Sequence, residues 1–212
     1  RWGLNTLLVD KAKFPRDKVC GDALPGNALG ILQELDLLAE LDTLPGVATR
    51  SVTFGSPNGN SFNVVIGSEE NGIKPRGSII RRSVFDNFLF NKAADLVTAQ
   101  DQFIVKDLLW KKDQIVGIAG MKSGVDQVQE FWAPVIIGAD GFSSIVARKA
   151  GLYKHMPDHL CVSVRQYFQH VGDLKEQMEL HFIGEIQPGY FWIFPLENGF
   201  ANVGVGMLYS AM

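Results

Sequence analysis

Residues 135–144 constrain the fold more than any other part of the chain. The first five are mostly apolar and β-branched, which predicts a buried parallel strand that runs straight into Asp140 and Gly141. Ser143 can then cap a helix over residues 144–150. A carboxylate at the carboxyl end of a strand, next to a helix N-terminus, is where open α/β sheets bind ligands such as a pyrophosphate. Asp-Gly is also a common turn that only starts a helix, so that alternative stays open.

The composition limits the class of protein. The chain has 212 residues, 46% of them hydrophobic, and a formal net charge of −3, which is enough for one sizeable core or for one domain and part of another. The sequence has no dominant basic patch, which argues against a nucleic-acid partner. No apolar run reaches the roughly 20 residues of a membrane helix. Cys20 and Cys161 fit no metal spacing, so we expect no metal and a reducing, cytoplasmic setting.

The hydrophobic pattern divides the chain into a mixed part and a part rich in strands. It predicts strands over residues 4–10, 47–54, 61–66, 77–82, 103–110, 115–121, 128–133, 160–170, 178–183, 190–195 and 201–207, helices over 27–41 and from 83 onward, and a polar turn over 67–75. Because the pattern changes near residue 156, we predict an α/β domain with an antiparallel β insertion over residues 1–156. Part of a mainly β domain should follow over residues 157–212.

Asp10 ends an apolar strand near the start of the chain. In a dinucleotide-binding unit, an acid at this place accepts hydrogen bonds from the ribose hydroxyls; the alternative is a surface acid at a strand end. A glycine-rich phosphate-binding turn should precede such an acid by roughly 20 residues, and only nine residues precede Asp10. If the functional interpretation holds, the first strand and its glycine turn are missing from this chain.

The loop of residues 14–25 is too polar and too broken to be core. Gly21 would let its backbone approach a planar ring closely, and Arg16 could meet a phosphate or a carboxylate. Cys20 is either a reactive thiol or a small buried residue, which is the usual case for cysteine.

Arg82 lies at the end of a predicted strand, just before an S-x-x-D capping pattern at residues 83–86. Its guanidinium could reach a phosphate or a ribityl oxygen of a cofactor. A salt bridge with Asp86 is the alternative. Arg81 alternates to the opposite side of the strand and is the less favoured choice.

Four aromatic residues lie close together between residues 190 and 194. On a strand, Tyr190, Trp192 and Phe194 share one face. Such a face is either protein core or the wall of an apolar pocket, and a pocket of this kind would suit a hydrophobic substrate.

Together these segments resemble the geranylgeranyl reductase family of FAD-dependent oxidoreductases, relatives of the p-hydroxybenzoate hydroxylase-like flavoproteins. The resemblance rests on residues 9–11, 14–16, 18–22, 82–86 with 89, 138–141 with 143 and 144, and 188–195. The candidate FAD-binding residues are then Asp10, Arg16, Cys20, Gly21, Asp22, Arg82, Asp140 and Gly141. The family implies that the loop from Cys20 to Asp22 lies by the flavin ring, with Cys20 as the candidate catalytic residue. It also implies that the substrate cavity is lined by Tyr190, Trp192 and Phe194.

The resemblance implies a partial Rossmann-like FAD-binding domain followed by part of a β substrate domain. Its chemistry would be hydride transfer from reduced flavin to a carbon–carbon double bond of a prenyl lipid, with NAD(P)H or ferredoxin as the electron donor. Such a substrate would suggest transient contact with a membrane surface. We expect an internal fragment that lacks both terminal flavin-binding segments of the family, binds FAD weakly or not at all, and is inactive by itself.

Two other functions stay open at this point. A flavin-dependent aromatic monooxygenase or halogenase would share the scaffold. Halogenases of this group carry Trp-x-Trp-x-Ile-Pro, where this chain has Tyr190 and Phe194 at the first Trp and the Ile, and this difference favours the reductase. The other alternative is a non-catalytic domain that holds a lipid in the apolar cavity. The sequence predicts no oligomeric state.

Overall fold

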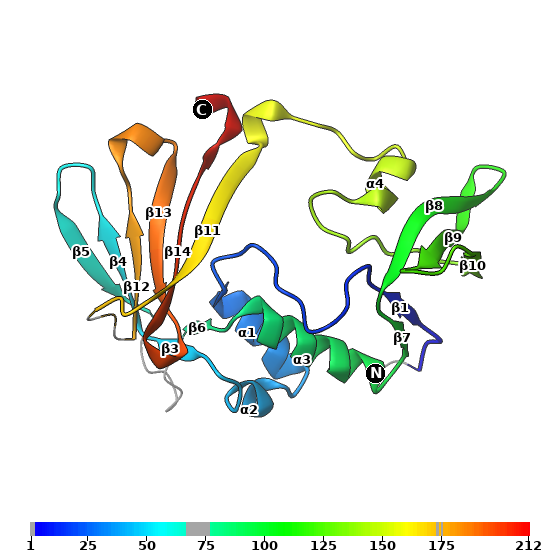
Figure 1. Cartoon of the computed structure of the whole chain (residues 1–212), viewed down its shortest axis with the longest axis horizontal. Coiled ribbons are helices and arrows are strands. Elements are labelled where there is room, and N and C mark those ends of the chain that lie inside the picture. The colour runs from blue at the N-terminus through cyan, green and yellow to red at the C-terminus, as the bar shows by residue number, and fades with distance from the viewer. Residues whose placement is uncertain (1–2, 67–76, 173, 175) are drawn as a thin grey trace. The chain divides into compact units, whose positions relative to one another are not determined.

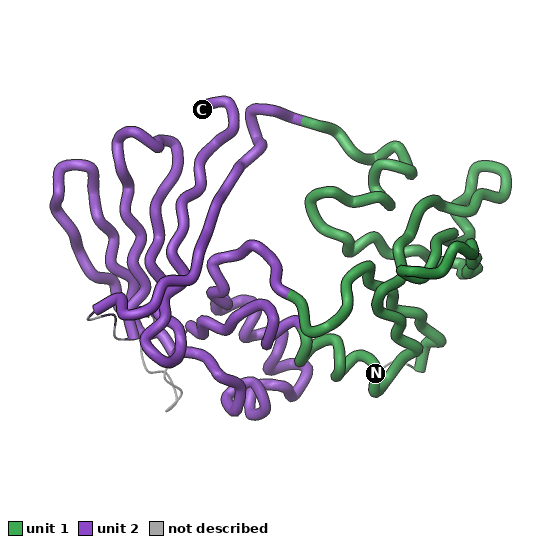
Figure 2. The backbone as a smooth tube through the Cα atoms, in the orientation of Figure 1, with its two compact units in different colours: residues 1–16, 87–155 green, residues 17–86, 156–212 purple. Residues whose placement is uncertain are grey.

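The computed structural model describes residues 3–66, 77–172, 174 and 176–212, and these fall into two compact units (Figures 1 and 2). Unit 1 comprises residues 1–16 and 87–155, and unit 2 comprises residues 17–86 and 156–212. One change of unit therefore falls beside the expected boundary at residue 156. The units are interleaved along the sequence, so the assignment of residues 1–156 and 157–212 to a cofactor and a substrate domain stays a prediction.

Unit 1 is built from two small sheets and contains the three antiparallel strands expected from the sequence. Its strands are β1 (Leu7–Val9), β7 (Thr98–Gln100), β8 (Phe103–Lys111), β9 (Gln114–Lys122) and β10 (Val128–Trp132). β1 and β7 pair in parallel, and the other three form an antiparallel sheet in the order β10-β9-β8. Its core contains Phe103, Leu108 and Ile118, which are at most 9% exposed.

Residues 135–139 depart from the expected fold, because they form no strand. Val135 and Ile137 are 70% and 83% exposed, whereas Ile136 packs against the core of unit 1. No described strand pairs with this segment, and a strand needs a neighbour to satisfy its backbone hydrogen-bonding groups. The prediction of a buried parallel strand here is therefore wrong for this structure.

The helix after this segment is α4 (Ile145–Lys149). It begins one residue later than expected, since Ser144 rather than Ser143 is its N-cap, and the Ser144 Oγ accepts a hydrogen bond from the backbone N–H of Ala147 at 2.9 Å. Gly151 follows the helix in the left-handed conformation, with φ of 71°, as is typical of a helix C-terminus.

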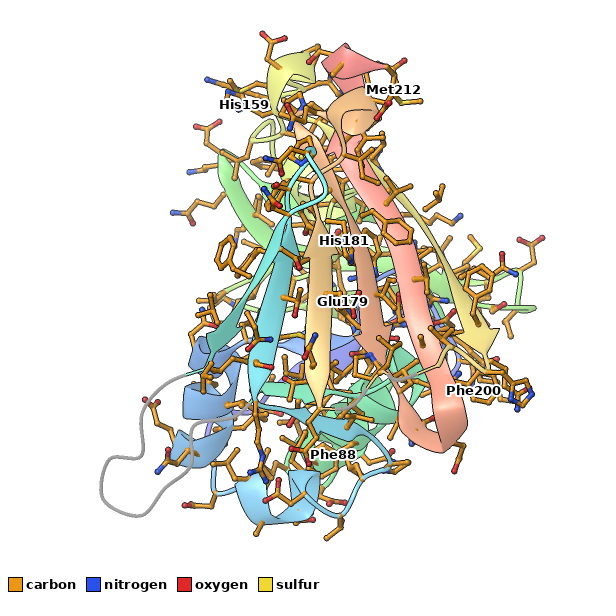
Figure 3. All side chains as sticks on the ribbon, turned by 90° about the vertical axis from the view of Figure 1, so that its left-hand side faces the viewer. Phe88, His159, Glu179, His181, Phe200 and Met212 are labelled. Atoms are coloured by element: carbon orange, nitrogen blue, oxygen red, sulfur yellow. The ribbon has the colours of Figure 1, made fainter. Side chains whose placement is uncertain are left out.

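A six-stranded sheet forms most of unit 2, in the order β11-β14-β13-β12-β4-β5. Its strands are β4 (Ser51–Gly55), β5 (Ser61–Val65), β11 (Cys161–Gln169), β12 (Gln177–His181), β13 (Gly189–Pro195) and β14 (Phe200–Leu208). β12 pairs with β4 in parallel, and the other pairs are antiparallel. Figure 3 shows this sheet, with Glu179 and His181 labelled on β12. A smaller sheet joins β2 (Ala23–Leu24), β6 (Gly77–Ile79) and β3 (Val47–Thr49).

The helix expected over residues 27–41 is two helices, α1 (Gly26–Glu34) and α2 (Leu38–Leu41). Asp36 lies between them with φ of 59°, a left-handed conformation that ends a right-handed helix. α3 (Arg82–Ala94) begins at Arg82, so Ser83 lies inside the helix and not at its cap.

Four short 3-10 helices complete the part of the fold that the structure describes. They are η1 (Pro157–His159), η2 (Gly184–Ile186), η3 (Glu197–Gly199) and η4 (Tyr209–Ala211). The polar turn expected over residues 67–75 lies outside the described residues. Within the described part of the chain, the helices are too short or too polar for any of them to cross a bilayer.

The register between β13 and β14 places aromatic side chains opposite glycines. Tyr190 lies opposite Gly206, and Trp192 lies opposite Gly204. A Cβ atom on Gly204 would lie only 2.2 Å from Cζ2 of Trp192, so the missing side chain leaves the space that the indole occupies. Trp192 is 6% exposed and belongs to the core of unit 2.

We predict that Gly204→Ala destabilises the protein by about 1–3 kcal/mol, because the indole must leave its well-packed position. Urea unfolding followed by tryptophan fluorescence measures this change. Gly206→Ala is the matched control in the same strand, because its Cβ atom would have no neighbour nearer than 3.5 Å; we expect a change within about 0.5 kcal/mol. Equal stability of the Gly204→Ala variant and the natural protein would contradict this account of the packing.

Candidate functional site

A pocket of about 660 Å³ lies in unit 2, at the end of the large sheet where β11 and β13 begin and β14 ends. Cys20 and Gly21 contribute a loop to its wall, and Tyr190 and Trp192 contribute aromatic rings. Its volume is within the range of small-molecule sites. Both cysteines of the chain line it, since Cys161 stands at the start of β11. Both thiols are free.

Asn202, on β14, joins two walls of this pocket. It is completely buried, and its Nδ2 donates hydrogen bonds to the carbonyl oxygen of Cys20 and to Oδ2 of Asp22, each at 2.7 Å. Its Oδ1 accepts a hydrogen bond from Nε1 of Trp192 at 3.0 Å. One amide side chain therefore fixes both the loop and the indole, and it uses both of its N–H donors and its carbonyl oxygen.

Asp22 is the buried carboxylate at the centre of this network. Its Oδ2 also accepts a hydrogen bond from the Tyr167 hydroxyl at 2.8 Å, and its Oδ1 accepts one from the backbone N–H of Arg82 at 3.2 Å. Burial raises the pKa of the Asp22 carboxyl, and the hydrogen bonds from Asn202, Tyr167 and Arg82 only partly offset this rise. The residue has φ of 65°, a conformation that aspartate tolerates better than most residues.

Tyr167, on β11, is held at its ring by two arginines and at its hydroxyl by Asp22. The guanidinium carbons of Arg81 and Arg165 lie 4.4 Å and 4.2 Å from the centroid of its ring. Burial and the hydrogen bond to Asp22 raise the pKa of its hydroxyl. The phenol therefore keeps its proton at physiological pH and donates a hydrogen bond to the Asp22 carboxyl group. Arg165 in turn donates a hydrogen bond to the carbonyl oxygen of Lys18 at 3.3 Å, so β11 also holds the loop that carries Cys20.

The sequence left open whether the aromatic face of β13 is protein core or the wall of a pocket, and the structure shows some of each. Phe194 is 9% exposed and belongs to the core. A Cβ atom on Gly21 would lie 2.9 Å from Cε2 of Phe194, so the loop rests directly on this ring. Tyr190 lines the pocket and is 43% exposed, whereas Trp192 lines the pocket and also belongs to the core.

Arg82 forms the salt bridge with Asp86 that was the alternative to a cofactor contact. Its Nε and Nη2 donate to the two carboxylate oxygens at 2.7 Å each. Burial would lower the pKa of Arg82, but the interactions with Asp86 and Cys20 outweigh it and leave the pKa raised. The guanidinium is therefore fully charged beside Cys20, and it joins the helix α3 to the loop.

Asp140 and Gly141, in unit 1, form the turn that starts α4. The Asp140 carboxylate accepts hydrogen bonds from the Ser144 hydroxyl and from the backbone N–H groups of Ile145 and Val146, the last two at 2.7 Å and 3.2 Å. Partial burial would raise the pKa of Asp140, but these hydrogen bonds outweigh it and lower the pKa. Gly141 has φ of 77°, which explains the glycine after the aspartate.

Asp10 and Arg16 also lie in unit 1. Asp10 follows β1, and its Oδ1 accepts a hydrogen bond from the backbone N–H of Ala12 at 2.8 Å. The guanidinium of Arg16 lies 5.1 Å from the ring centroid of Phe14, which stacks on Phe90. The predicted site residues thus form two groups, one in each unit, and their roles in binding a cofactor stay predictions.

Asn202 and Tyr167 are the site residues that the sequence analysis missed. Asn202 is the only strongly polar side chain in the run Phe200–Leu208. A polar residue in an otherwise apolar strand signals a buried hydrogen bond, although it does not identify the partner.

Comparison with solved structures defines the class of fold. No protein-family model matches the chain. The structure superposes on that of a geranylgeranyl bacteriochlorophyll reductase-like protein from Thermoplasma acidophilum with a TM-score of 0.85 and 22% identity, over 98% of this chain and 51% of that one. It superposes on a myxobacterial FAD-dependent chondrochloren halogenase with a TM-score of 0.84 and 22% identity, over 99% of this chain and 48% of that one. The predicted α/β fold, part of an FAD-dependent oxidoreductase scaffold, is confirmed.

Sequence relatives of the chain include two reductases. The chain is 30% identical to menaquinone reductase from Mycolicibacterium smegmatis, over 100% of this chain and 51% of the relative. It is 29% identical to digeranylgeranylglycerophospholipid reductase 1 from Methanopyrus kandleri, over 97% of this chain and 52% of the relative. The resemblance to geranylgeranyl-type reductases is thereby confirmed. The chain spans about half the length of the curated relatives that it matches.

We predict that Asp22 makes the stability of the protein depend on pH. A carboxyl whose pKa is raised in the folded state binds its proton more tightly there than in the unfolded chain. The free energy of unfolding therefore falls as pH rises above about 4, the ordinary pKa of aspartate, until the folded-state pKa is passed. Asp22→Asn should remove this dependence on pH. As the pH rises from 4 to 7, the free energy of unfolding of the natural protein should therefore fall relative to that of the variant.

Urea unfolding at several pH values between these limits measures the effect. Asp113→Asn is the control, because Asp113 is exposed in the turn between β8 and β9. Parallel pH profiles for the natural protein and the Asp22→Asn variant would contradict the prediction.

Proposed function

We propose that the protein is an FAD-dependent oxidoreductase that reduces carbon–carbon double bonds of a prenyl lipid, of the geranylgeranyl type, by hydride transfer from reduced flavin. The observation that carries the proposal is the apolar pocket of about 660 Å³, bordered by the loop of Cys20 and Gly21. A hydrocarbon chain fits such a pocket, because apolar walls bind it without leaving polar groups unpaired. The names of the two sequence relatives support a reductase that acts on an isoprenoid lipid.

Each of the two units carries residues that would suit part of a flavin cofactor. Gly21 borders the pocket, but the ring of Phe194 occupies the space left by its missing side chain, so a flavin ring would have to approach the loop from another side. Asp10 would hold the ribose, and Gly141, with its backbone exposed beside the N-terminus of α4, would lie near a phosphate or ribityl oxygen. Arg16 would add a positive charge. Arg82 would contact the cofactor while it keeps its salt bridge with Asp86.

The flavin would supply the hydride, and the chain must supply the proton that completes the reduction. Cys20 is the candidate donor, because its side chain lines the pocket and lies beside Arg82. Hydride addition to one alkene carbon and proton transfer from the thiol to the other give a saturated bond, and water returns a proton to the thiolate. NAD(P)H or ferredoxin would reduce the flavin. A lipid substrate would bring the protein to a membrane surface.

A flavin-dependent monooxygenase or halogenase is the second candidate, supported by the fold shared with the chondrochloren halogenase. The two solved structures have nearly equal TM-scores, so the fold does not separate the candidates. The sequence relatives and Tyr190, at a position where halogenases of this group carry a tryptophan, favour the reductase. A non-catalytic lipid-binding domain is the third.

Anaerobic incubation of the full-length protein with reduced FAD and a geranylgeranyl-bearing glycerolipid separates these functions. We expect mass spectrometry to show lipid products that have gained hydrogen across their double bonds. A hydroxylated or halogenated aromatic product, formed in air from a suitable substrate, would support the second candidate. Binding of the lipid without turnover would contradict the reductase and support the binding domain.

The Cys20→Ala variant tests the proton donor in the same assay. We expect lipid binding close to that of the natural protein and a turnover lower by about a hundredfold, in the range of lost general acid catalysis. Cys161→Ala is the matched control, because Cys161 lines the same pocket at the start of β11 and has no proposed chemical role.

A further inference from the structure

The pocket of unit 2 has an uncharged lining. Among the described residues that line it, none is an aspartate, glutamate, lysine, arginine or histidine. Apart from the two thiols, its polar side chains are those of Ser163, Gln187, Tyr190 and Trp192. Nε1 of Trp192 already donates a hydrogen bond to Asn202. The hydroxyl groups of the serine and the tyrosine and the glutamine amide therefore provide hydrogen-bonding groups for a ligand.

The serine and the glutamine lie toward the exposed end of the pocket. At the other end, the loop with Gly21 rests on Phe194, which is 9% exposed. Ser163 is level with Tyr190 through their common partner on β14, and the stretch of β13 from Tyr190 to Phe194 is about 13 Å long. Gln187 lies just before β13 and, like Ser163, is exposed. A ligand can therefore bury an apolar chain toward the loop and leave its polar end at the serine and the glutamine.

The segments that lead into this exposed end carry acids. η1, directly before β11, carries Asp158 and His159, and η2, between two lining residues, carries Glu185. η4, directly after β14, carries no charged residue. Neither lysine nor arginine occurs in residues 156–163 or 182–190. The charges around this end of the pocket would therefore repel an anionic group more than they would attract it.

Two arginines lie beside the loop of Cys20, and an acid pairs with each of them. Nη2 of Arg165 lies 2.5 Å from Oδ1 of Asp17, and Arg82 forms its salt bridge with Asp86. Neither arginine lines the pocket, and Lys18, on the loop itself, does not line it either. An anionic head group in the pocket would therefore lie beside no lysine or arginine of the described lining.

The cost of burying a charge decides between the possible head groups. A phosphate that leaves water needs a counter-charge, which proteins usually supply with arginine or lysine. Hydroxyl and amide groups instead match an uncharged oxygen. We propose that the substrate is a prenyl lipid whose head group carries a hydroxyl or carbonyl oxygen and no phosphate, and that this head group lies at Ser163 and Gln187. The prenyl chain rests on the proposed function, whereas the selection against an anion rests on the lining.

The test uses the full-length protein and two ligands with the same chain, geranylgeraniol and geranylgeranyl monophosphate. Each ligand competes with 1-aminoanthracene, an uncharged probe whose fluorescence rises in apolar surroundings, and the competition gives a Kd. The KM of each ligand is measured anaerobically with reduced FAD. Gln187→Lys places a positive charge at the proposed head-group position. Gln166→Lys is the matched control, because Gln166 is exposed and lies on the face of β11 opposite to Ser163.

We expect the natural protein to bind the alcohol about tenfold or more tightly than the phosphate, with a correspondingly lower KM. Gln187→Lys should reduce this ratio about threefold or more, and Gln166→Lys should leave it unchanged. If Gln187→Lys is poorly folded, the ratio in the natural protein decides.

Two results would overturn the proposal. One is binding of the phosphate by the natural protein that equals or exceeds binding of the alcohol, and the other is an unchanged ratio in a well-folded Gln187→Lys variant. Reduction of both ligands with equal KM would also refute the head group while it keeps the proposed function. If the alcohol binds more tightly but neither ligand is reduced, the head group stands and the proposed function fails.

Discussion

The buried contact between Asp22 and Asn202 is the interaction on which the rest of the pocket depends. Both residues are completely buried, and their side chains meet at 2.7 Å. In a region of low dielectric constant such a contact is strong, and losing either partner leaves unpaired polar groups at considerable cost. Through this pair, the loop of Cys20, the indole of Trp192 and the hydroxyl of Tyr167 are held in one arrangement.

The pocket takes its shape from the register of the large sheet. On the pocket side, Tyr190, Trp192 and Phe194 of β13 lie opposite a glycine, a glycine and an asparagine of β14. A slip of one residue would turn these side chains to the opposite face. The same register that buries Trp192 over Gly204 leaves Gly206 uncovered. Core packing and ligand space therefore have one common cause, which is the alternation of side chains along two paired strands.

Much of this fold could be predicted from the sequence where the evidence is local. The alternating pattern identified β11, β13 and β14, and the spacing of Arg82 and Asp86 offered the salt bridge that forms. The apolar run over residues 135–139 predicted a buried strand that does not form, because apolarity does not report whether a neighbouring strand is present. The contact of Asn202 with Asp22 joins residues 180 positions apart, and no local pattern contains such a pair.

The most direct test of this account is to map where a prenyl chain binds. A geranylgeranyl lipid with a photoreactive diazirine on its chain is bound to the full-length protein, irradiated, and located by mass spectrometry of the peptides. The account predicts labels on the loop of Cys20 and Gly21 and on the pocket ends of β13 and β14. Labels confined to unit 1, or to the opposite face of the sheet around Glu179 and His181 (Figure 3), would contradict it.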